Sequence, residues 1–213
     1  MWINITNWFT KITGWLPSKI VFRTRIHYED RSIQGRRIKG SAILISNHTS
    51  VFDYAAYLFV FFNRTLRFQM AEVLFKKKPL GLFLKMLGGI YVNRESHDFS
   101  FVAKSEKILS KGGVVGIFPE SRLAKPGEKR PLPFKPSAAY IALSTGVKVI
   151  PAYTDGNYFN RKKNHIMVGT PIDVTVYANP NLSDKENMEV ITKKLRERII
   201  ELGRELDGRI KKG

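Results

Sequence analysis

The sequence of 213 residues contains no cysteine and no apolar run long enough to cross a membrane. The absence of cysteine excludes disulfide bonds, a thiol nucleophile and cysteine-based zinc sites, and it fits a reducing compartment. The longest uncharged apolar run is YAAYLFVFF (residues 54–62), well short of the roughly 20 residues that a transmembrane helix needs. No basic residue precedes Lys11 and no small-residue cleavage site follows, so we expect no secretory signal.

Acidic residues are also scarce: 18 Asp and Glu stand against 36 Lys and Arg, which gives a formal net charge of +18. Such a chain favours polyanionic partners, which are nucleic acid, an anionic membrane surface or acidic soluble molecules. The basic residues are scattered, and no RRM, zinc finger or other nucleic-acid module is recognisable. We therefore expect no nucleic-acid partner. Nucleic-acid binding is kept as an alternative hypothesis, although it would explain only the net charge.

The N-terminal segment MWINITNWFTKITGWL (residues 1–16) holds all three tryptophans of the chain. At 100° per residue, seven of its large apolar side chains fall within an arc of about 140°. They are Trp2, Ile5, Trp8, Phe9, Ile12, Trp15 and Leu16. The pattern predicts an amphipathic helix that ends at Pro17. One interpretation packs this helix on the domain's own core, whereas the three tryptophans favour a helix that lies in the membrane interface.

We accordingly divide the chain into a membrane-interface segment (residues 1–19) and a main domain (residues 20–213). The candidate membrane-binding residues are Trp2, Trp8, Phe9 and Trp15. Nearby basic residues suited to anionic headgroups are Lys19, Arg23 and Arg25. The expected location is the cytoplasmic face of a membrane, as a peripheral or monotopic protein.

Short apolar runs alternate with helical patterns through the main domain. This alternation predicts an α/β fold with a mixed, largely parallel sheet flanked by helices. The predicted strands are 20–28, 42–46, 66–70, 89–93, 113–118, 147–153 and 165–169. The predicted helices are 50–62, 79–87, 99–111, 136–145 and 184–207.

The stretch SNHTSVFDY (residues 46–54) places a histidine five positions before an aspartate. Within one helix these side chains would point roughly 140° apart. However, His48 falls in the predicted strand-to-helix turn and Asp53 in the first helical turn, so the chain can fold back and join them. A carboxylate on one imidazole nitrogen fixes the tautomer and stabilises the cation. Such a pair would make His48 a general base for a hydroxyl nucleophile.

A second interpretation of the same residues is structural. Ser50 to Asp53 matches a capping box, in which Asp53 reaches back to the Ser50 amide. The residues by themselves leave both interpretations open. The other histidines, His27, His97 and His165, are isolated and have no ligand spacing, so we expect no metal site. No G-x-S-x-G elbow, Walker A loop or H-E-x-x-H motif offers competing chemistry.

Four blocks in a fixed order carry a family resemblance. They are NHTSVFD (47–53), GGIYVNR (88–94), IFPESR (117–122) and VIPAY (149–153). Together they resemble the glycerolipid acyltransferase family, which includes the lysophosphatidic acid (1-acyl-sn-glycerol-3-phosphate) acyltransferases. The resemblance covers about residues 40–155, and its first and third blocks are the most distinctive.

The resemblance implies transfer of a fatty acyl chain from an acyl thioester, on coenzyme A or acyl carrier protein, to a glycerol hydroxyl. The expected acceptor is lysophosphatidic acid and the product phosphatidic acid. His48 is then the base and Asp53 its partner, and the acceptor hydroxyl attacks the thioester directly. No cofactor is implied beyond the acyl donor as co-substrate. The tetrahedral oxyanion needs hydrogen-bond donors, for which we consider backbone amides near the turn.

Arg94 ends the second block and Arg122 the third, and both follow predicted strands, where ligands often meet an α/β sheet. A guanidinium fork suits a phosphate. The resemblance makes both arginines candidates for the acceptor phosphate, with Glu120 ordering the site. The alternative is surface ion pairing, of Arg94 with Glu95 and of Arg122 with Glu120.

Two departures from the family pattern concern the acceptor. Many relatives have F-P-E-G-T-R in the third block, whereas this chain is one residue shorter and has Ser121 in place of the glycine. Many relatives also carry a lysine where this chain has Ala71 and Glu72. Glycerol-3-phosphate or another lysophospholipid therefore stays open as the acceptor, as does a non-catalytic lipid-binding protein of the same fold. The basic loop 124–136 is suited to an acidic carrier protein, coenzyme A phosphates or headgroups, and is equally well explained as a solvated loop.

Overall fold

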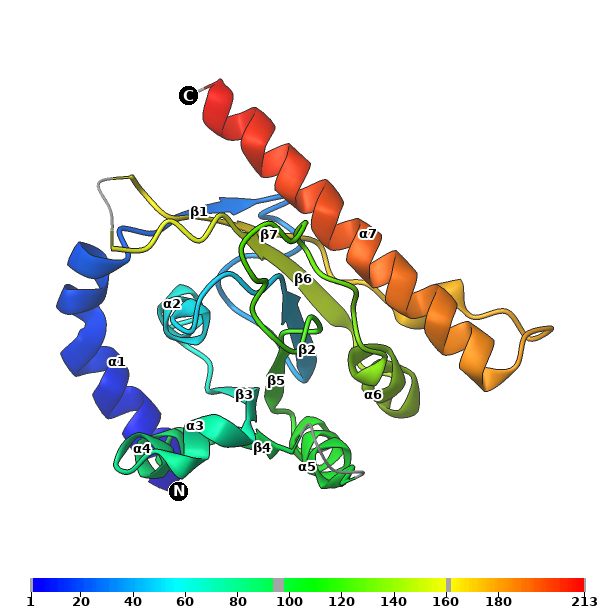
Figure 1. Cartoon of the computed structure of the whole chain (residues 1–213), viewed down its shortest axis with the longest axis horizontal. Coiled ribbons are helices and arrows are strands. Elements are labelled where there is room, and N and C mark those ends of the chain that lie inside the picture. The colour runs from blue at the N-terminus through cyan, green and yellow to red at the C-terminus, as the bar shows by residue number, and fades with distance from the viewer. Residues whose placement is uncertain (1, 94–97, 160–161, 213) are drawn as a thin grey trace.

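The computed structural model describes residues 2–93, 98–159 and 162–212. Within these residues one seven-stranded sheet has the order β1-β7-β6-β2-β5-β3-β4 (Figure 1). The strands are β1 Arg25–Tyr28, β2 Ala42–Ser46, β3 Leu66–Ala71, β4 Ile90–Val92, β5 Val114–Ile117, β6 Val149–Thr154 and β7 His165–Val168. The helices are α1 Trp2–Val21, α2 Asp53–Val60, α3 Glu72–Lys76, α4 Leu80–Met86, α5 Ser100–Leu109, α6 Ser137–Thr145 and α7 Asp184–Lys211, with a 3₁₀ turn η1 at Val174–Tyr177.

The sheet is mixed and largely parallel, which confirms the predicted fold class. Strands β4, β3, β5, β2 and β6 pair in parallel. Strand β7 pairs antiparallel with β6, and β1 pairs in parallel with β7. The two strands at this edge thus run against the others.

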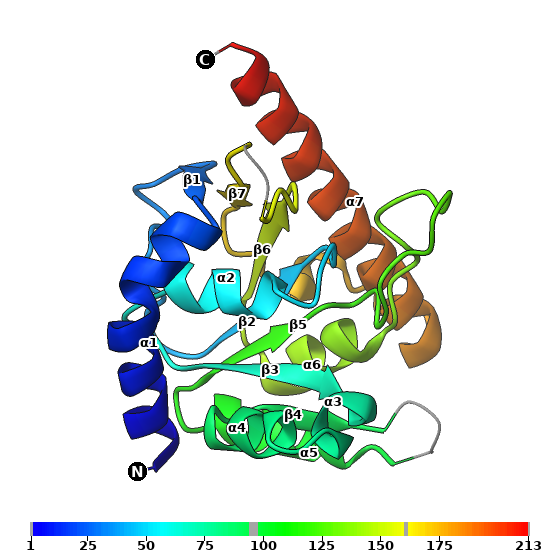
Figure 2. The same ribbon diagram turned by 60° about the vertical axis from the view of Figure 1, so that its left-hand side comes forward.

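Helices cover both faces of the sheet (Figures 1 and 2). On one face, Leu44 and Ile150 pack with residues of α2 such as Tyr57. On the other, Ile43 and Ile45 pack with α5, α6 and α7. Every residue of β2 is buried. Burial on both faces explains why this strand is a continuous apolar run rather than an alternating one.

The N-terminal helix differs from the prediction at its end. Helix α1 continues through Pro17 to Val21, so the prediction that it ends at Pro17 was wrong, and so was the strand start at residue 20. A proline removes one hydrogen bond from a helix interior, but Ser18 and Phe22 are buried on the far side of it and hold the continuation in place. Helix α1 therefore crosses the boundary at residue 19 that the sequence suggested.

Helix α1 presents its polar side to the domain and its apolar side outwards. Asn7 and Lys11 are 1% and 2% exposed. The Lys11 ammonium donates to the carbonyls of Phe62 and Arg64, at 2.8 and 2.6 Å, just beyond α2. The outward side chains are Trp2, Ile5, Trp8, Phe9, Ile12, Trp15, Leu16 and Ile20, all exposed. The structure thus contradicts the interpretation in which this apolar face packs on the domain's core.

Among the described residues, no helix combines the length and the apolar character needed to cross a bilayer.

Candidate active site

The candidate site lies at the carboxyl end of β2, in the middle of the sheet. His48 lies in the turn that follows the strand, and Asp53 is the first residue of α2. Strands β5 and β6 flank β2 on either side and end at the same edge. Side chains that follow parallel strands gather at such an edge. The local fold therefore brings residues from the first and third sequence blocks into one place.

The His48 and Asp53 side chains are in contact. The His48 Nδ1 atom lies 2.8 Å from the Asp53 Oδ2 atom. The imidazole stacks on the Phe118 ring, with centroids 4.3 Å apart and planes within 10°. The His48 side chain is 19% exposed and that of Asp53 is fully buried. No hydrogen bond to a described residue occupies the Nε2 atom, so this nitrogen is available for a proton.

Asp53 also caps the turn. Its Oδ2 atom accepts hydrogen bonds from the amides of Thr49 and Ser50 at 2.7 and 2.9 Å. Its Oδ1 atom accepts from the Thr49 hydroxyl at 2.8 Å. The two interpretations of the sequence are therefore compatible in geometry, because one carboxylate both orients the imidazole and holds the turn that carries it.

Glu120 also holds the turn that carries His48. This residue follows β5 and is 3% exposed. Its Oε1 atom accepts from the His48 amide at 2.7 Å, and its Oε2 atom accepts from the Leu132 amide at 2.6 Å. Burial raises the pKa of Glu120, although both amide bonds act against that shift. Both oxygens are thus used within the protein, which makes Glu120 a positioning residue in this geometry.

Arg122 is exposed and pairs with neither Glu120 nor a core group. Its Nη1 and Nη2 atoms donate to the two carboxylate oxygens of Glu128 at 2.6 and 2.8 Å. This contact lowers the pKa of Glu128 to about 2. The predicted ion pair of Arg122 with Glu120 was therefore wrong in its partner. Arg94, the other phosphate candidate, lies outside the described residues.

The comparisons with known proteins agree with the four blocks. The family model described as "Acyltransferase" matches residues 23–155. The chain belongs to this acyltransferase family.

Three curated relatives carry the name 1-acyl-sn-glycerol-3-phosphate acyltransferase. The Bacillus subtilis protein is 29% identical over 67% of this chain and 71% of its own length. The Borreliella burgdorferi protein is 26% identical over 76% of this chain and 66% of its own length. The human beta form is 25% identical over 75% of this chain. The chain spans only 58% of the length of that human relative.

A solved structure shares the fold. The crystal structure of the 1-acyl-sn-glycerophosphate (LPA) acyltransferase PlsC from Thermotoga maritima superposes with a TM-score of 0.64. The match covers 94% of this chain and 79% of the other, at 20% sequence identity.

Sequence reasoning missed two residues that build the candidate site. Asn47 is 4% exposed and exchanges two hydrogen bonds of 2.8 Å with the backbone of Thr154. It thereby ties the end of β2 to the end of β6. The Phe118 ring stacks against the His48 imidazole. Both positions stood in the quoted blocks, but the contacts depend on strands that are adjacent only in the folded sheet.

The turn amides that we considered as oxyanion donors are engaged elsewhere. Those of Thr49 and Ser50 donate to Asp53, and that of His48 donates to Glu120. This arrangement assigns the amides to holding the dyad rather than to the tetrahedral oxyanion.

Two of the remaining histidines are not isolated, contrary to the prediction. His27 Nε2 and His165 Nδ1 lie 2.9 Å apart where β1 pairs with β7. The described residues contain no group of three or more His, Asp or Glu side chains placed to hold a metal. His97 lies outside the described residues.

The Glu120 carboxylate offers a test of its positioning role. Glutamine at this position would turn an N–H group toward one of two buried amides. We expect Glu120→Gln to lower the free energy of unfolding by about 1–3 kcal/mol and to lower kcat more than it raises KM for the acceptor. Urea titration and steady-state kinetics measure both effects. Glu197→Gln, which breaks only an exposed pair with Lys194, is the matched control. A raised acceptor KM at unchanged stability would instead make Glu120 a substrate ligand.

Proposed function

We propose that the chain transfers a fatty acyl chain from an acyl thioester to the free hydroxyl of lysophosphatidic acid, giving phosphatidic acid. The observation that carries the proposal is the contact of His48 with the buried Asp53 at the carboxyl end of β2. The names of the three curated relatives support the acceptor and the reaction class. The donor is acyl-CoA or acyl carrier protein.

The reaction follows from what each nitrogen of His48 does. Asp53 holds the proton on Nδ1, so Nε2 is the basic atom. As the acceptor hydroxyl attacks the thioester carbonyl, Nε2 takes its proton. The tetrahedral intermediate then expels the thiolate, and the imidazolium returns the proton to that sulfur. One ester bond forms, one thioester bond breaks, and His48 ends the cycle neutral.

No acyl-enzyme is needed in this scheme. The nearby hydroxyls are all engaged with other partners: that of Thr49 donates to Asp53, that of Ser50 accepts from the Phe52 amide, and that of Ser46 bonds Tyr57. None of them is hydrogen-bonded to His48. A direct attack by the acceptor therefore fits the site better than a serine nucleophile.

We further propose that the protein works at a membrane surface, on the cytoplasmic face, as a peripheral or monotopic protein. The exposed tryptophan-rich face of α1 supports this assignment. Trp15 borders an open groove that also contains Arg31, Arg37 and Lys39. Aromatic rings beside basic residues suit the headgroup region of an anionic leaflet.

Acyl transfer itself is the test of the proposed function. Radiolabelled acyl-CoA and acyl carrier protein are offered with lysophosphatidic acid, glycerol-3-phosphate and lysophosphatidylcholine. Labelled phosphatidic acid as the main product is the expected result. Turnover of another acceptor would keep the reaction and change the substrate. Vesicle binding without turnover of any acceptor would favour a non-catalytic lipid-binding protein.

Arg122 is our candidate for binding the acceptor phosphate. The phosphate oxygens would replace the Glu128 carboxylate as the partner of the guanidinium. The bidentate geometry that Arg122 makes with Glu128 is the one a phosphate monoester also accepts. We expect Arg122→Ala to raise KM for lysophosphatidic acid about 10–100-fold and Arg122→Lys to restore it only in part. Glu128→Gln, which removes the competing charge, is expected to lower KM. An unchanged KM in Arg122→Ala would remove this residue from the phosphate site.

A further inference from the structure

An open pocket of about 750 Å³ lies at the opposite end of the sheet from His48. Arg64 and Thr65, just before β3, and Gly113, just before β5, form part of its wall. Further wall residues come from β3 and α3, from α4 and the residues after it, from α5 and the turn after it, and from the first turn of α1. Since His48 follows the carboxyl end of β2, this pocket is separate from the candidate active site.

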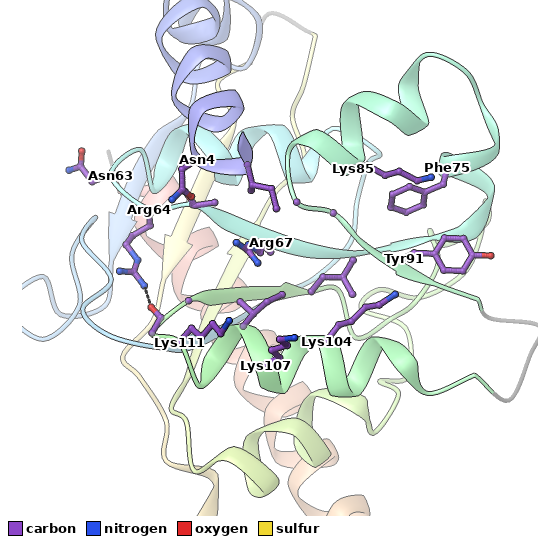
Figure 3. A pocket seen from close by; sticks show the side chains of 18 residues that line it. Asn4, Asn63, Arg64, Arg67, Phe75, Lys85, Tyr91, Lys104, Lys107 and Lys111 are labelled. Atoms are coloured by element: carbon purple, nitrogen blue, oxygen red, sulfur yellow. Dashed lines mark hydrogen bonds between the residues drawn. The ribbon is translucent and has the colours of Figure 1, made fainter. Parts of the chain in front are cut away.

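The pocket is strongly basic. Its cationic side chains are Arg64, Arg67, Lys85, Lys104, Lys107 and Lys111. No carboxylate lines it among the residues that the structure describes. Lys104 and Lys107 project into it from α5, and Lys111 lies in the turn that follows this helix (Figure 3). A concave surface with charges of one sign concentrates the field of those charges and attracts an anion.

Arg67 is the central cation of this pocket (Figure 3). Its side chain is half-buried on β3, and it has no hydrogen-bond or ion-pair partner within the described part of the chain. Burial lowers its pKa from the usual arginine value, yet a guanidinium remains charged at any physiological pH. Arg64, by contrast, donates to the carbonyls of Gly40 and Gly112. A half-buried guanidinium, with no counter-ion among the residues that the structure describes, thus faces the cavity.

The rim of the pocket joins the exposed apolar surface of the molecule. Ile3 and Asn4, in the first turn of α1, line it, and Trp2 beside them is 75% exposed. Lys85 reaches it from α4, where Leu82 is 63% exposed. Figures 1 and 2 show α4 beside the N-terminal end of α1. Apolar side chains around a basic hollow match a lipid, whose phosphate lies directly above its acyl chains.

We propose that this pocket binds the phosphate group of an anionic phospholipid of the membrane, at a site separate from that of the acyl acceptor. Arg67 receives the phosphate in its fork, and the lysines of α5 neutralise the remaining charge. The bound headgroup fixes the N-terminal end of α1 and the adjoining α4 against the bilayer. This inference does not depend on acyl transfer, because no residue of the pocket belongs to the dyad.

The test is vesicle binding by the full chain. The vesicles contain phosphatidylcholine with or without phosphatidylglycerol, which is neither the proposed acceptor nor the proposed product. We expect Arg67→Gln to weaken binding to the anionic vesicles about tenfold or more. Lys77→Gln removes the same charge from an exposed position between α3 and α4 that does not line the pocket. Its expected effect is about fivefold or less, the contribution of one diffuse surface charge.

Further arms distinguish a lipid from a free anion. Calorimetry with short-chain phosphatidylglycerol, below its micelle concentration, is compared with inorganic phosphate. We expect the lipid to bind wild type more tightly than phosphate does, and Arg67→Gln to lose that binding. The double variant Lys104→Gln/Lys107→Gln removes two charges from the same pocket and changes no residue of a strand. Equal vesicle binding by Arg67→Gln and Lys77→Gln, or phosphate binding as tight as lipid binding, would overturn the proposal.

Discussion

Replacing His48 by alanine is expected to lower kcat/KM for acyl transfer about 10³-fold. General-base catalysis by a positioned side chain contributes roughly 10²–10⁴-fold. Among the described residues, the carboxylates beside His48 are those of Asp53 and Glu120, which are buried and already hydrogen-bonded to backbone amides, so neither is placed to take over as the base. The fold should survive, because the lost contacts are one stack on Phe118 and one hydrogen bond of a partly exposed ring. Initial rates with lysophosphatidic acid, together with a thermal melt, measure both quantities.

The matched control is His27→Ala, which removes a histidine that contacts His165 far from β2. We expect it to keep the wild-type rate. Equal rates for His48→Ala and wild type would show that the dyad is structural and that Asp53 serves only as a cap. A loss that solvent imidazole partly restores would support the base assignment directly, since the added base would occupy the vacated space.

Asp53 shows why the sequence could propose the dyad without deciding its role. Its spacing from His48 fitted a catalytic partner and its spacing from Ser50 fitted a cap, and neither pattern excludes the other. The folded turn satisfies both, because a carboxylate has lone pairs enough for two amides, a hydroxyl and an imidazole. Only the activity of variants separates the two contributions.

The fold class followed from patterns that act over short distances. The buried run AILIS predicted β2, and the structure confirms it as a strand buried throughout. However, sequence periodicity does not predict which residues of different strands contact each other in the sheet. Asn47 and Thr154, 107 positions apart, are bonded, and this contact was not predicted. Helix α1 passes Pro17 because packing on both sides outweighs one lost hydrogen bond, which is a tertiary effect.

Ser121 replaces a glycine of the family pattern, and the structure shows the backbone conformation that it adopts. Its φ is +59°, in the left-handed region where glycine is at ease and other residues are strained. The family resemblance placed a glycine near this point of the third block. In this chain a serine adopts that conformation directly after Glu120, and the next residue, Arg122, lies beside Glu128.

Substituting serine for Trp2, Phe9 and Ile12 together is expected to lower the partitioning of the protein onto anionic vesicles about 10³-fold. These side chains are 75%, 66% and 66% exposed on α1. Partial burial of one such side chain in the membrane interface contributes about tenfold to binding. Sedimentation with vesicles over a range of lipid concentrations measures the change.

Substitution tests the apolar face more cleanly than removal of the helix does. Lys11 and Asn7 hold α1 to the domain through the carbonyls of Phe62, Arg64 and Leu87. Deleting the helix would leave those carbonyls without their donors and would confuse loss of the fold with loss of membrane binding. Serine on the outward face leaves these bonds in place, so the thermal melt of the triple variant should match that of wild type.

The control must remove apolar surface of similar exposure from another part of the molecule. Phe99, Tyr140 and Val176 are 68%, 47% and 71% exposed and lie outside α1 and α4. Changing these three to serine should leave vesicle binding within about twofold, because scattered surface apolar groups are ordinary in soluble domains. If both triple variants lose binding equally, general stickiness explains the association. If neither triple variant loses vesicle binding, the outward apolar face of α1 does not bind lipid, and a protein partner becomes the expected occupant of that face.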